Sequence, residues 1–303
     1  MGATIYVTLE PCCHHGKQPP CTEAIAEAGI KKVVVGSRDP NPQVSGKGNR
    51  FLREHGIEVV EDFMKDECDA INGPFFHYIQ SNRPYIVMKY AMTMDGKIAA
   101  YTGDSKWITG EEARKHVHGL RNRYTGIMAG VGTVLADNPE LTCRTDGGRN
   151  PVRIVCDTNL RTPLDYKIVE TADSVRTLIA TCVTDKEKQL PYIEKGCEIL
   201  EVQEKEGHVD VRDLVTKLGE KKIDSILLEG GGTLNWSFVK EGLINRVEAY
   251  IAPKVFGGKD AATPVEGKGV PSPAECMNMK IVNVAGLGND ILIESEVVNC
   301  SQE

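Results

Sequence analysis

The sequence predicts an α/β protein with two regions, and three observations support this prediction. Short apolar runs rich in Val and Ile alternate with segments of helical pattern over residues 4–60. A second set of such runs begins at Tyr85. Between the two sets lies the segment SNRP at residues 81–84, where proline disfavours helix in the residue before it. We therefore expect domains at residues 1–81 and 82–303.

Residues 4–60 follow the order β-α-β-α-β, which favours parallel strands. The runs TIYVTL, KKVVVGS and IEVVED have the composition of strands. The segment TEAIAEAG is predicted to form a helix with Thr22 as a candidate N-cap and Gly29 as its stop, and GNRFLREHG a second helix. Residues 62–81 are expected to be helical, with an interruption at the NGP segment of residues 72–74.

The second region begins with PYIVMKYAMTMDGKIAA, which is predicted to be a strand, a turn and the start of another strand. Thr109 and Glu112 match a capping box ahead of the predicted helix EEARKHVHGLRNR. The runs TGIMAGVGTVLAD, VRIVCD, RTLIATC and SILLEGG are predicted to be strands, and DVRDLVTKLGEKK a helix between two of them. Near the end, RVEAYIAPKVFGG is a predicted strand, and KIVNVAGLGNDILIESEV a predicted hairpin that turns at residues 286–290.

Composition excludes several classes of function. A net charge of −7 and a pI near 5.6 argue against non-specific binding of nucleic acid, which needs a basic face. No apolar run reaches membrane-spanning length, and the segment MGATIYVTLE lacks the features of a signal peptide. The ten cysteines form no dense framework and are expected to be reduced thiols. We expect a cytoplasmic protein with no membrane partner.

Two cysteines, Cys12 and Cys21, flank a loop rich in His, Gly and Pro in the stretch VTLEPCCHHGKQPPCTEAI. Thiolates bind Zn²⁺ well, and a helix start eases their charge. The alternative is that these cysteines are small buried residues, which is a common fate of cysteine. Spacing alone favours neither interpretation.

The sequence of this stretch resembles the second metal motif of the cytidine-deaminase superfamily, in the version found in riboflavin biosynthesis. The segment DPNPQVSGKGNRFLREHGIEV extends the resemblance. The resemblance implies that Cys12 and Cys21 are zinc ligands. Zinc deaminases take a His ligand and a catalytic Glu from an H-x-E motif that precedes the cysteines. The eleven residues before Cys12 contain no His, and their one acid, Glu10, belongs to the family's own L-E-P context. We expect an incomplete zinc site without deaminase activity, which His14, His15 or water would complete.

From residue 83 onward the chain resembles the reductase half of the bifunctional deaminase/reductases of riboflavin biosynthesis. The matching stretches are KYAMTMDGKIA, TGDSKWITG, GVGTVLADNPELTCR, VCDTNLRTP, LLEGGGTLNWSF and APKVFGGKDA. The resemblance implies a partial cytidine-deaminase-like α/β domain followed by a dihydrofolate-reductase-like α/β domain with a mixed sheet. It also implies a homodimer that reduces 5-amino-6-(5-phosphoribosylamino)uracil to the ribitylamino product with NADPH.

Reduction of a phosphorylated sugar needs cations that hold the phosphate, and Arg121 and Arg144 are the candidates because guanidinium groups match phosphate geometry. A solvated helix face is the alternative for Arg121. The resemblance places Ser105, Leu141, Arg144 and Glu229 at the substrate. The resemblance also implies that Lys89 points into the site, and that Lys89 and Glu229 are catalytic residues. The proton donor stays open between Lys89, Glu229 and water.

A glycine-rich turn, EGGGT at residues 229–233, follows the strand SILL and opens the helix TLNWSFVKEG. Glycines let a backbone approach phosphates, and a helix N-terminus favours anions, although a plain strand-to-helix turn gives the same pattern. The basic residues Arg161 and Lys186 are candidates for reading a 2′-phosphate. By resemblance, the residues that contact NADPH are Ala91, Trp107, Thr133, Asp137, Thr158, Gly231, Gly232, Thr233, Leu234, Asn235, Trp236 and Ser237.

Three alternatives to a reductase with an inactive deaminase remnant stay open. The first is a complete bifunctional zinc deaminase/reductase whose start was assigned too late. The second is a non-catalytic protein that binds a nucleotide. The third is a relative of the same fold that acts on a pterin or another nucleotide, and Arg121 with Arg144 favours a phosphorylated substrate over a plain pterin. A partial deaminase domain is expected to expose apolar faces that a dimer partner covers or that leave it poorly ordered.

Overall fold

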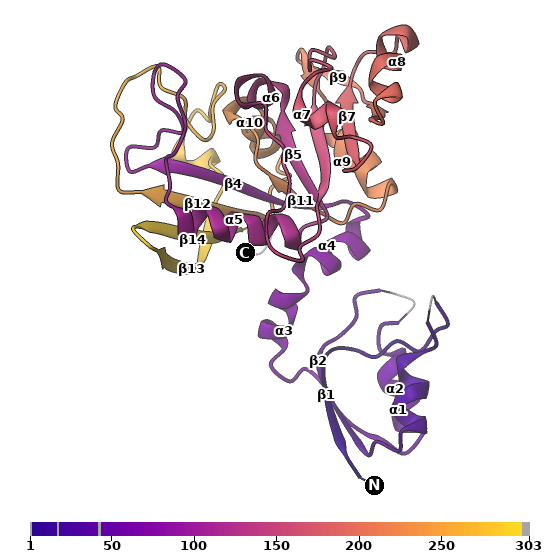
Figure 1. The fold of residues 1–303 in the computed structure, drawn as a ribbon. Coiled ribbons are helices and arrows are strands. Elements are labelled where there is room, and N and C mark those ends of the chain that lie inside the picture. Colours follow the sequence, from indigo (N-terminus) through magenta and orange to yellow (C-terminus); the bar gives the residue numbers. More distant parts are fainter. Residues whose placement is uncertain (1, 17, 42–43, 299–303) are drawn as a thin grey trace. The chain divides into compact units, whose positions relative to one another are not determined.

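The computed structural model describes residues 2–16, 18–41 and 44–298. The chain divides into two units between Arg83 and Pro84, and each unit is described by itself (Figure 1). Over the described residues, no helix combines the length and the apolar composition that a membrane span requires.

The first unit is a three-stranded parallel sheet with strand order β1-β2-β3. This confirms the parallel pairing expected from the β-α-β-α-β pattern. The residues 62–81 form two helices that meet at Asn72, as the NGP segment predicted. The elements are β1 (Thr4–Leu9), α1 (Cys21–Glu27), β2 (Lys32–Ser37), α2 (Lys47–Glu54), β3 (Glu58–Val60), α3 (Lys65–Ile71) and α4 (Gly73–Ser81).

The core of the first unit lies between the sheet and the helices α1 and α2. It is formed by Ile25, Val33, Val35, Leu52 and Ile57. On the edge strand β1 the exposure alternates, and the side chain of Tyr6 is 70% exposed. The other exposed residues of β1 are Thr4 and Thr8, so Tyr6 is the large apolar side chain that this strand exposes, and the expectation of a broad apolar face stays a prediction.

Glu10 joins β1 to α2. Its buried carboxylate accepts backbone N–H groups of Gly46 at 3.0 Å, Gly48 at 3.1 Å and Asn49 at 3.3 Å. These groups lie at the start of α2, where N–H groups lack helical partners. Glycine is required at position 48 because a side chain there would collide with the carbonyl oxygen of Pro11. The acid of the LEP segment therefore has a structural role.

The second unit contains a nine-stranded mixed sheet with strand order β13-β14-β12-β4-β11-β5-β6-β7-β8. The strands from β12 to β8 run parallel, and β13 and β14 form an antiparallel hairpin at one edge. The elements are β4 (Tyr85–Thr93), α5 (Glu111–Arg123), β5 (Gly126–Gly130), α6 (Val131–Asp137), β6 (Val152–Cys156), α7 (Lys167–Glu170), β7 (Thr177–Thr181), α8 (Lys186–Glu194), β8 (Glu198–Glu201), β9 (Glu204–Lys205), β10 (His208–Val209), α9 (Val211–Glu220), β11 (Ser225–Leu228), α10 (Gly232–Lys240), β12 (Arg246–Ala252), a 3₁₀ turn (Pro273–Glu275), β13 (Met279–Leu287) and β14 (Asp290–Val297).

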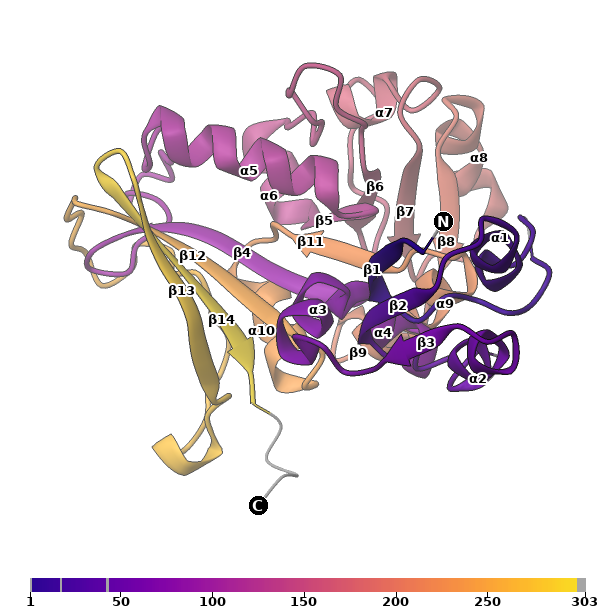
Figure 2. The same ribbon diagram turned by 90° about the horizontal axis from the view of Figure 1, so that it is seen from below.

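Helices cover both faces of this sheet. The helices α5, α6, α7 and α8 lie on one face, and α9 and α10 on the other (Figure 2). Alternation along each strand sorts the side chains: on β4, Val87 packs toward α5, whereas Ile86 and Met88 pack toward α9 and α10. The carboxyl ends of all the parallel strands meet at one edge, which is where α6 and α10 begin.

Three local predictions for this unit were wrong. The strand expected after the turn at Asp95 and Gly96 does not form, since residues 94–110 contain no strand. The run TGIMAGVGTVLAD is not one strand, because it bends at Gly130 from β5 into α6. No capping box forms at Thr109: the N-cap of α5 is Gly110, and its N–H donates to the carboxylate of Asp290 at 2.6 Å. A residue 180 positions away supplies the cap, which no local pattern can reveal.

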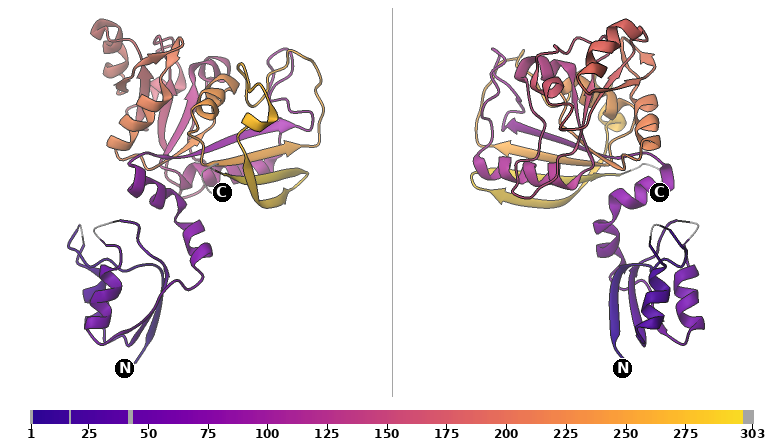
Figure 3. Two further views of the ribbon diagram at one scale, coloured as in Figure 1. Left: turned by 180° about the vertical axis from the view of Figure 1, so that it is seen from behind. Right: turned by 45° about the vertical axis from the view of Figure 1, so that its right-hand side comes forward.

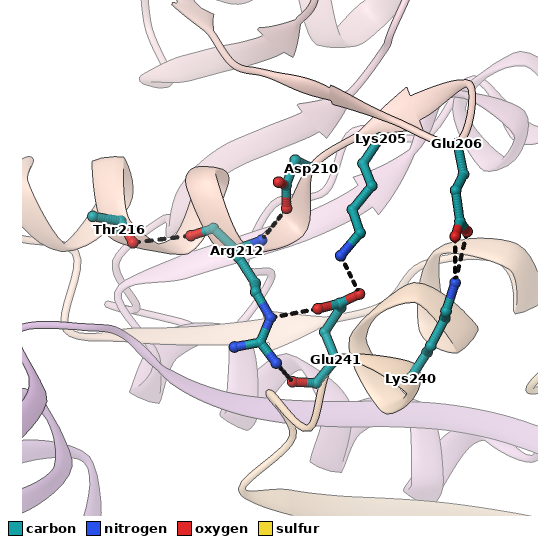
Figure 4. Close-up of polar contacts among 7 residues, drawn as sticks. All are labelled: Lys205, Glu206, Asp210, Arg212, Thr216, Lys240 and Glu241. Atoms are coloured by element: carbon teal, nitrogen blue, oxygen red, sulfur yellow. Dashed lines mark hydrogen bonds and ion pairs between the residues drawn. The ribbon is translucent and has the colours of Figure 1, made fainter.

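Ion pairs anchor the carboxyl end of α10 (Figure 4). The carboxylate of Glu241, which follows this helix, accepts from Lys205 at 2.6 Å and also from Arg212. Arg212 Nη2 donates to the Glu241 carbonyl oxygen at 2.7 Å, so a cation meets the negative end of the helix. Lys240 pairs with Glu206 at 2.6 Å. These contacts fix α10 with its other end at the carboxyl edge of the sheet.

Candidate functional site

Three charged side chains meet beneath α5, at the carboxyl edge of the sheet. Met88 and Leu228 are register partners on the neighbouring parallel strands β4 and β11. Lys89 and Glu229 follow them directly in the sequence and therefore lie side by side. Lys89 Nζ lies 3.4 Å from Glu229 Oε2. Arg121, on α5, reaches the same carboxylate with Nε at 2.8 Å and Nη2 at 3.0 Å. The structure thus brings together three residues that the sequence separates by up to 140 positions.

Electrostatics fix the charge of Glu229. Its side chain is only 9% exposed. Burial by itself raises the pKa of this carboxyl, but Arg121 and Lys89 outweigh that effect and lower the pKa to about 2. Glu229 is therefore an ionised acceptor at neutral pH. Of the three proton donors left open by the sequence, Glu229 is excluded.

The two arginines differ in how they are held. Arg121 uses three nitrogens on protein acceptors, because Nη1 also donates to the Thr142 carbonyl oxygen at 3.1 Å. Arg144 has a side chain 59% exposed and makes one weak contact with Glu140, at 3.3 Å. Arg121 thus orients Glu229, and Arg144 is the cation that is open to a ligand. The expectation that both arginines are phosphate clamps stays a prediction, and Arg144 is the one whose side chain is exposed.

Leu141 lies between these arginines in the loop that follows α6. Its side chain is buried against α6 and α7, and its φ of 50° lies in the left-handed region. A contact with substrate could come only from its backbone. Ser105 lies in the loop before α5 and is partly buried.

A second buried cluster, which sequence reasoning missed, borders Lys89. Lys89 Nζ lies 5.8 Å from the ring centroid of Tyr250. The Tyr250 hydroxyl lies 2.7 Å from His116 Nδ1 and donates to Glu248 at 3.4 Å. Burial raises the pKa of Glu248. The alternation in RVEAYIA was the available signal, because it places Glu248 and Tyr250 on one face of β12.

The residues expected at the cofactor come from two adjacent helix starts. A Cβ atom added to Gly231 would lie 3.2 Å from Thr133 Oγ1, so the first turns of α6 and α10 touch. At Gly232 an added Cβ would lie 2.7 Å from the Thr263 carbonyl oxygen. Both glycines thus leave room for neighbouring atoms of the protein itself. We call these two residues the glycine cradle, and the helix N-terminus at which they lie is the feature that suits the phosphates of a dinucleotide.

A loop already covers this cradle. The N–H of Glu266 donates to the Gly232 carbonyl oxygen at 3.1 Å, and Thr233 Oγ1 donates to the Glu266 carboxylate at 3.4 Å. A cavity of about 550 Å³ lies between this loop and α10, with Trp236 in its lining. Glu266 was not singled out from the sequence, and no local signal marked it.

The other expected cofactor residues are spread along the same edge. Trp107 is 61% exposed and stacks on Arg114, and Lys106 beside it pairs with Asp137 at 3.6 Å. The carbonyl oxygen of Thr158 accepts from Thr181 at 3.1 Å. Three of the expected residues point into the protein interior instead. Leu234 and Asn235 are buried, and Ala91 packs under α5.

The cysteine pair has the spacing of two zinc ligands. Cys12 Sγ and Cys21 Sγ lie 3.5 Å apart, close to the ~3.8 Å that two thiolates span on a tetrahedral zinc ion with bonds of about 2.3 Å. Among the residues that the structure describes, however, no group of three His, Cys, Asp or Glu side chains could hold a metal. His15 pairs with Glu23 at 3.6 Å instead. The described residues therefore do not fit a catalytic zinc ion.

We predict that Glu229→Gln flattens the acid dependence of stability. The folded-state pKa of about 2 lies below the ordinary value of 4.5, so Glu229 stabilises the fold fully above pH 4.5, and this contribution is lost as the pH falls toward 2. Thermal unfolding at stepped pH measures it. Exposed Glu206→Gln is the control, with a small expected effect. Equal pH slopes in wild type and Glu229→Gln would contradict the prediction.

Comparison with known proteins finds similarities in both units. Residues 84–293 match the RibD C-terminal domain, and residues 1–37 match the zinc-binding region of cytidine and deoxycytidylate deaminases. The riboflavin biosynthesis protein RibD of Actinobacillus pleuropneumoniae is 53% identical over 298 residues, which cover 98% of this chain and 79% of that protein.

Solved structures agree with these matches. The chain is similar to a diaminohydroxyphosphoribosylaminopyrimidine deaminase/5-amino-6-(5-phosphoribosylamino)uracil reductase of Thermotoga maritima, with a TM-score of 0.85, 37% identity, and coverage of 98% of this chain and 80% of that one. A riboflavin biosynthesis reductase of Saccharomyces cerevisiae shares the fold at 19% identity and a TM-score of 0.56. The aligned region covers 75% of this chain and 99% of the yeast protein chain. The expected α/β architecture, a deaminase-like portion followed by a dihydrofolate-reductase-like domain with a mixed sheet, is confirmed. The chain belongs to the RibD family of riboflavin biosynthesis proteins.

Proposed function

We propose that this chain reduces 5-amino-6-(5-phosphoribosylamino)uracil to 5-amino-6-(5-phosphoribitylamino)uracil with NADPH. The observation that carries the proposal is the buried cluster of Lys89, Arg121 and Glu229 beside the glycine cradle of α10. The reaction adds a hydride to the sugar carbon of the ring-opened imine. The imine nitrogen gains the electron pair of the broken π bond and takes up a proton. A site for this reaction needs a positioned proton and a fixed acceptor next to a dinucleotide.

The three charged residues divide the work. Glu229 is ionised and accepts hydrogen bonds from N–H groups, which a uracil ring and its amino substituents offer. Arg121 holds that carboxylate with two hydrogen bonds and so fixes its direction. Lys89 carries a proton on Nζ within a side chain only 15% exposed, where bulk water is largely excluded. Lys89 is therefore the proton donor that we favour.

The cradle of Gly231 and Gly232 fits the phosphates of NADPH, which supplies the hydride when bound. Thr133 borders this cradle from α6. Of the two candidates for a 2′-phosphate, Arg161 has a side chain 56% exposed and only a 4.0 Å contact with Asp157, whereas Lys186 is paired with Glu201 and Gln189. We therefore assign the preference for NADPH over NADH to Arg161.

We further propose that this chain performs no deamination. Cys12 and Cys21 supply two ligands, and the described residues supply no third one, whereas a catalytic zinc needs three protein ligands and an activated water.

The nine cysteines within the described ranges are free thiols, which supports a reducing compartment such as the cytoplasm.

A homodimer is the proposed assembly. The strand β13 lies at the open edge of the nine-stranded sheet, in the yellow hairpin of Figure 3. It exposes Ile281 and Val284 to 59% each, and Val282 to 42%. A row of exposed β-branched side chains on an edge strand is unfavourable in a monomer and suits pairing with a second copy.

The reductase proposal is tested by a paired assay with the purified chain. We expect NADPH oxidation with the deaminated phosphoribosylaminouracil and no ammonia from the undeaminated pyrimidine. Lys89→Met is expected to lower kcat at least about 100-fold, since proton transfer by a positioned group contributes that much. Exposed Lys115→Met on α5 is the control. Ammonia release, or full activity of Lys89→Met, would contradict these expectations.

Glu266→Gln is expected to lower the KM for NADPH about twofold to fivefold with kcat unchanged. The Glu266 carboxylate contacts the first turn of α10 and repels an incoming phosphate, and a charge at a helix terminus is worth about 0.3–1 kcal/mol. Steady-state kinetics with varied NADPH measure the change, and Glu275→Gln serves as the control. A raised KM in Glu266→Gln would show that this carboxylate assists the cofactor instead.

The dimer proposal predicts that the double substitution Ile281→Lys/Val284→Lys yields a monomer. Two lysines on the edge of β13 oppose pairing through charge and through lost apolar contact. Light scattering coupled to gel filtration measures the mass, and Lys217→Ala on α9 is the control. A wild-type monomer, or a variant that remains dimeric, would rule out this face as the interface.

A further inference from the structure

We propose that His118 is a further specificity-determining residue of this site, and that it takes up a proton when the phosphate of the substrate binds. The inference rests on the proposed function in one respect, namely that the ligand carries a phosphate. It assigns a role to a side chain that the roles of Lys89, Arg121 and Glu229 leave unused.

The position of His118 follows from the helix. It precedes Arg121 by three residues on α5, so both side chains lie on one face, one turn apart. The loop after Leu141 packs against this face: Cys143 Sγ donates to the His118 carbonyl oxygen at 3.5 Å. Thr142 contacts both residues, because its backbone bonds to the His118 ring and its carbonyl oxygen accepts from Arg121. The same loop carries Arg144.

The ring has one unused nitrogen. His118 Nδ1 is buried, and within the described residues it has no hydrogen-bond partner. A buried polar atom without a partner is destabilising by about 1–3 kcal/mol. Stability alone therefore does not explain a histidine here.

The charges around the ring favour its neutral form in the free protein. Burial lowers the pKa of His118 most, and Arg121 and Arg144 lower it further. Glu229 and the Thr142 backbone act in the opposite direction and are outweighed. These are the charged groups that face the ring, from α5 itself, from the loop that carries Arg144, and from the end of β11.

A bound phosphate reverses this balance. A phosphate ester carries close to two negative charges above pH 7, and Arg144 is the exposed cation that would hold it. Placed beside Arg121, Arg144 and Glu229, the dianion changes the summed charge of the groups that face the ring from one positive to one negative charge, so the imidazolium form is favoured. The ring then supplies a third positive charge. A sugar without phosphate produces no such change, and the site thereby selects phosphorylated substrates.

The direction of the pH dependence follows from linkage. The pKa of His118 is higher in the complex than in the free protein. The ring's contribution to binding is therefore complete below the free-protein pKa and is lost as the pH rises through the pKa of the complex. Between these two values binding takes up a proton.

Calorimetric titration with ribose 5-phosphate tests this, in two buffers of different ionisation enthalpy at stepped pH from 6.5 to 7.5, where the phosphate itself is mostly a dianion. We expect proton uptake with ribose 5-phosphate and no binding-linked uptake with ribose. His118→Gln is expected to abolish the uptake and to weaken ribose 5-phosphate about tenfold, the size of one charge-assisted hydrogen bond. His118→Lys carries a permanent charge, so it is expected to retain affinity without uptake. Exposed His208→Gln should behave as wild type.

Three outcomes would overturn the proposal: no proton uptake by wild type, uptake that persists in His118→Gln, or no binding of ribose 5-phosphate at millimolar concentration. Circular dichroism confirms that each variant is folded, and His118→Lys provides the answer if His118→Gln is not. The reductase assay is separate. Proton-linked phosphate binding without NADPH oxidation would reject the reductase and keep this inference, whereas NADPH oxidation without proton uptake would do the reverse.

Discussion

The ion triad of Lys89, Arg121 and Glu229 is the interaction on which the candidate site depends. A carboxylate this deeply buried is stable only with cations beside it, because the loss of hydration is costly. The two cations come from β4 and α5, so the triad ties the central strands to the helix that covers them. Its consequence is that the Glu229 carboxylate is fixed as an acceptor of hydrogen bonds.

The parallel sheet explains why the groups that bind and react lie at one edge. In parallel strands the carboxyl ends meet, and the helices that follow them begin there with free N–H groups. The first turns of α6 and α10 touch at Thr133 and Gly231, a short way along this edge from Glu229. In the proposed function, an anionic dinucleotide and an anionic sugar phosphate would meet different parts of this edge, and the Glu266 carboxylate lies at the first turn of α10.

The first unit shows that packing and chemistry are separable. Its three strands and two covering helices form a core, and Glu10 ties β1 to α2 through three backbone N–H groups. The cysteine pair retains the spacing of zinc ligands. The described residues nevertheless gather no third ligand, and His15 lies 3.6 Å from Glu23 of α1.

The sequence by itself determined the alternation of strands and helices and the family, because these depend on local periodicity and on motifs within short windows. The site residues that it named stay predictions. The sequence did not determine the bend of the chain at Gly130 or the cap that Asp290 gives to α5, since distant partners decide both. Only the tertiary structure showed that Arg121 holds Glu229. Three separate segments converge there, and burial and two nearby cations together set the charge of that carboxyl.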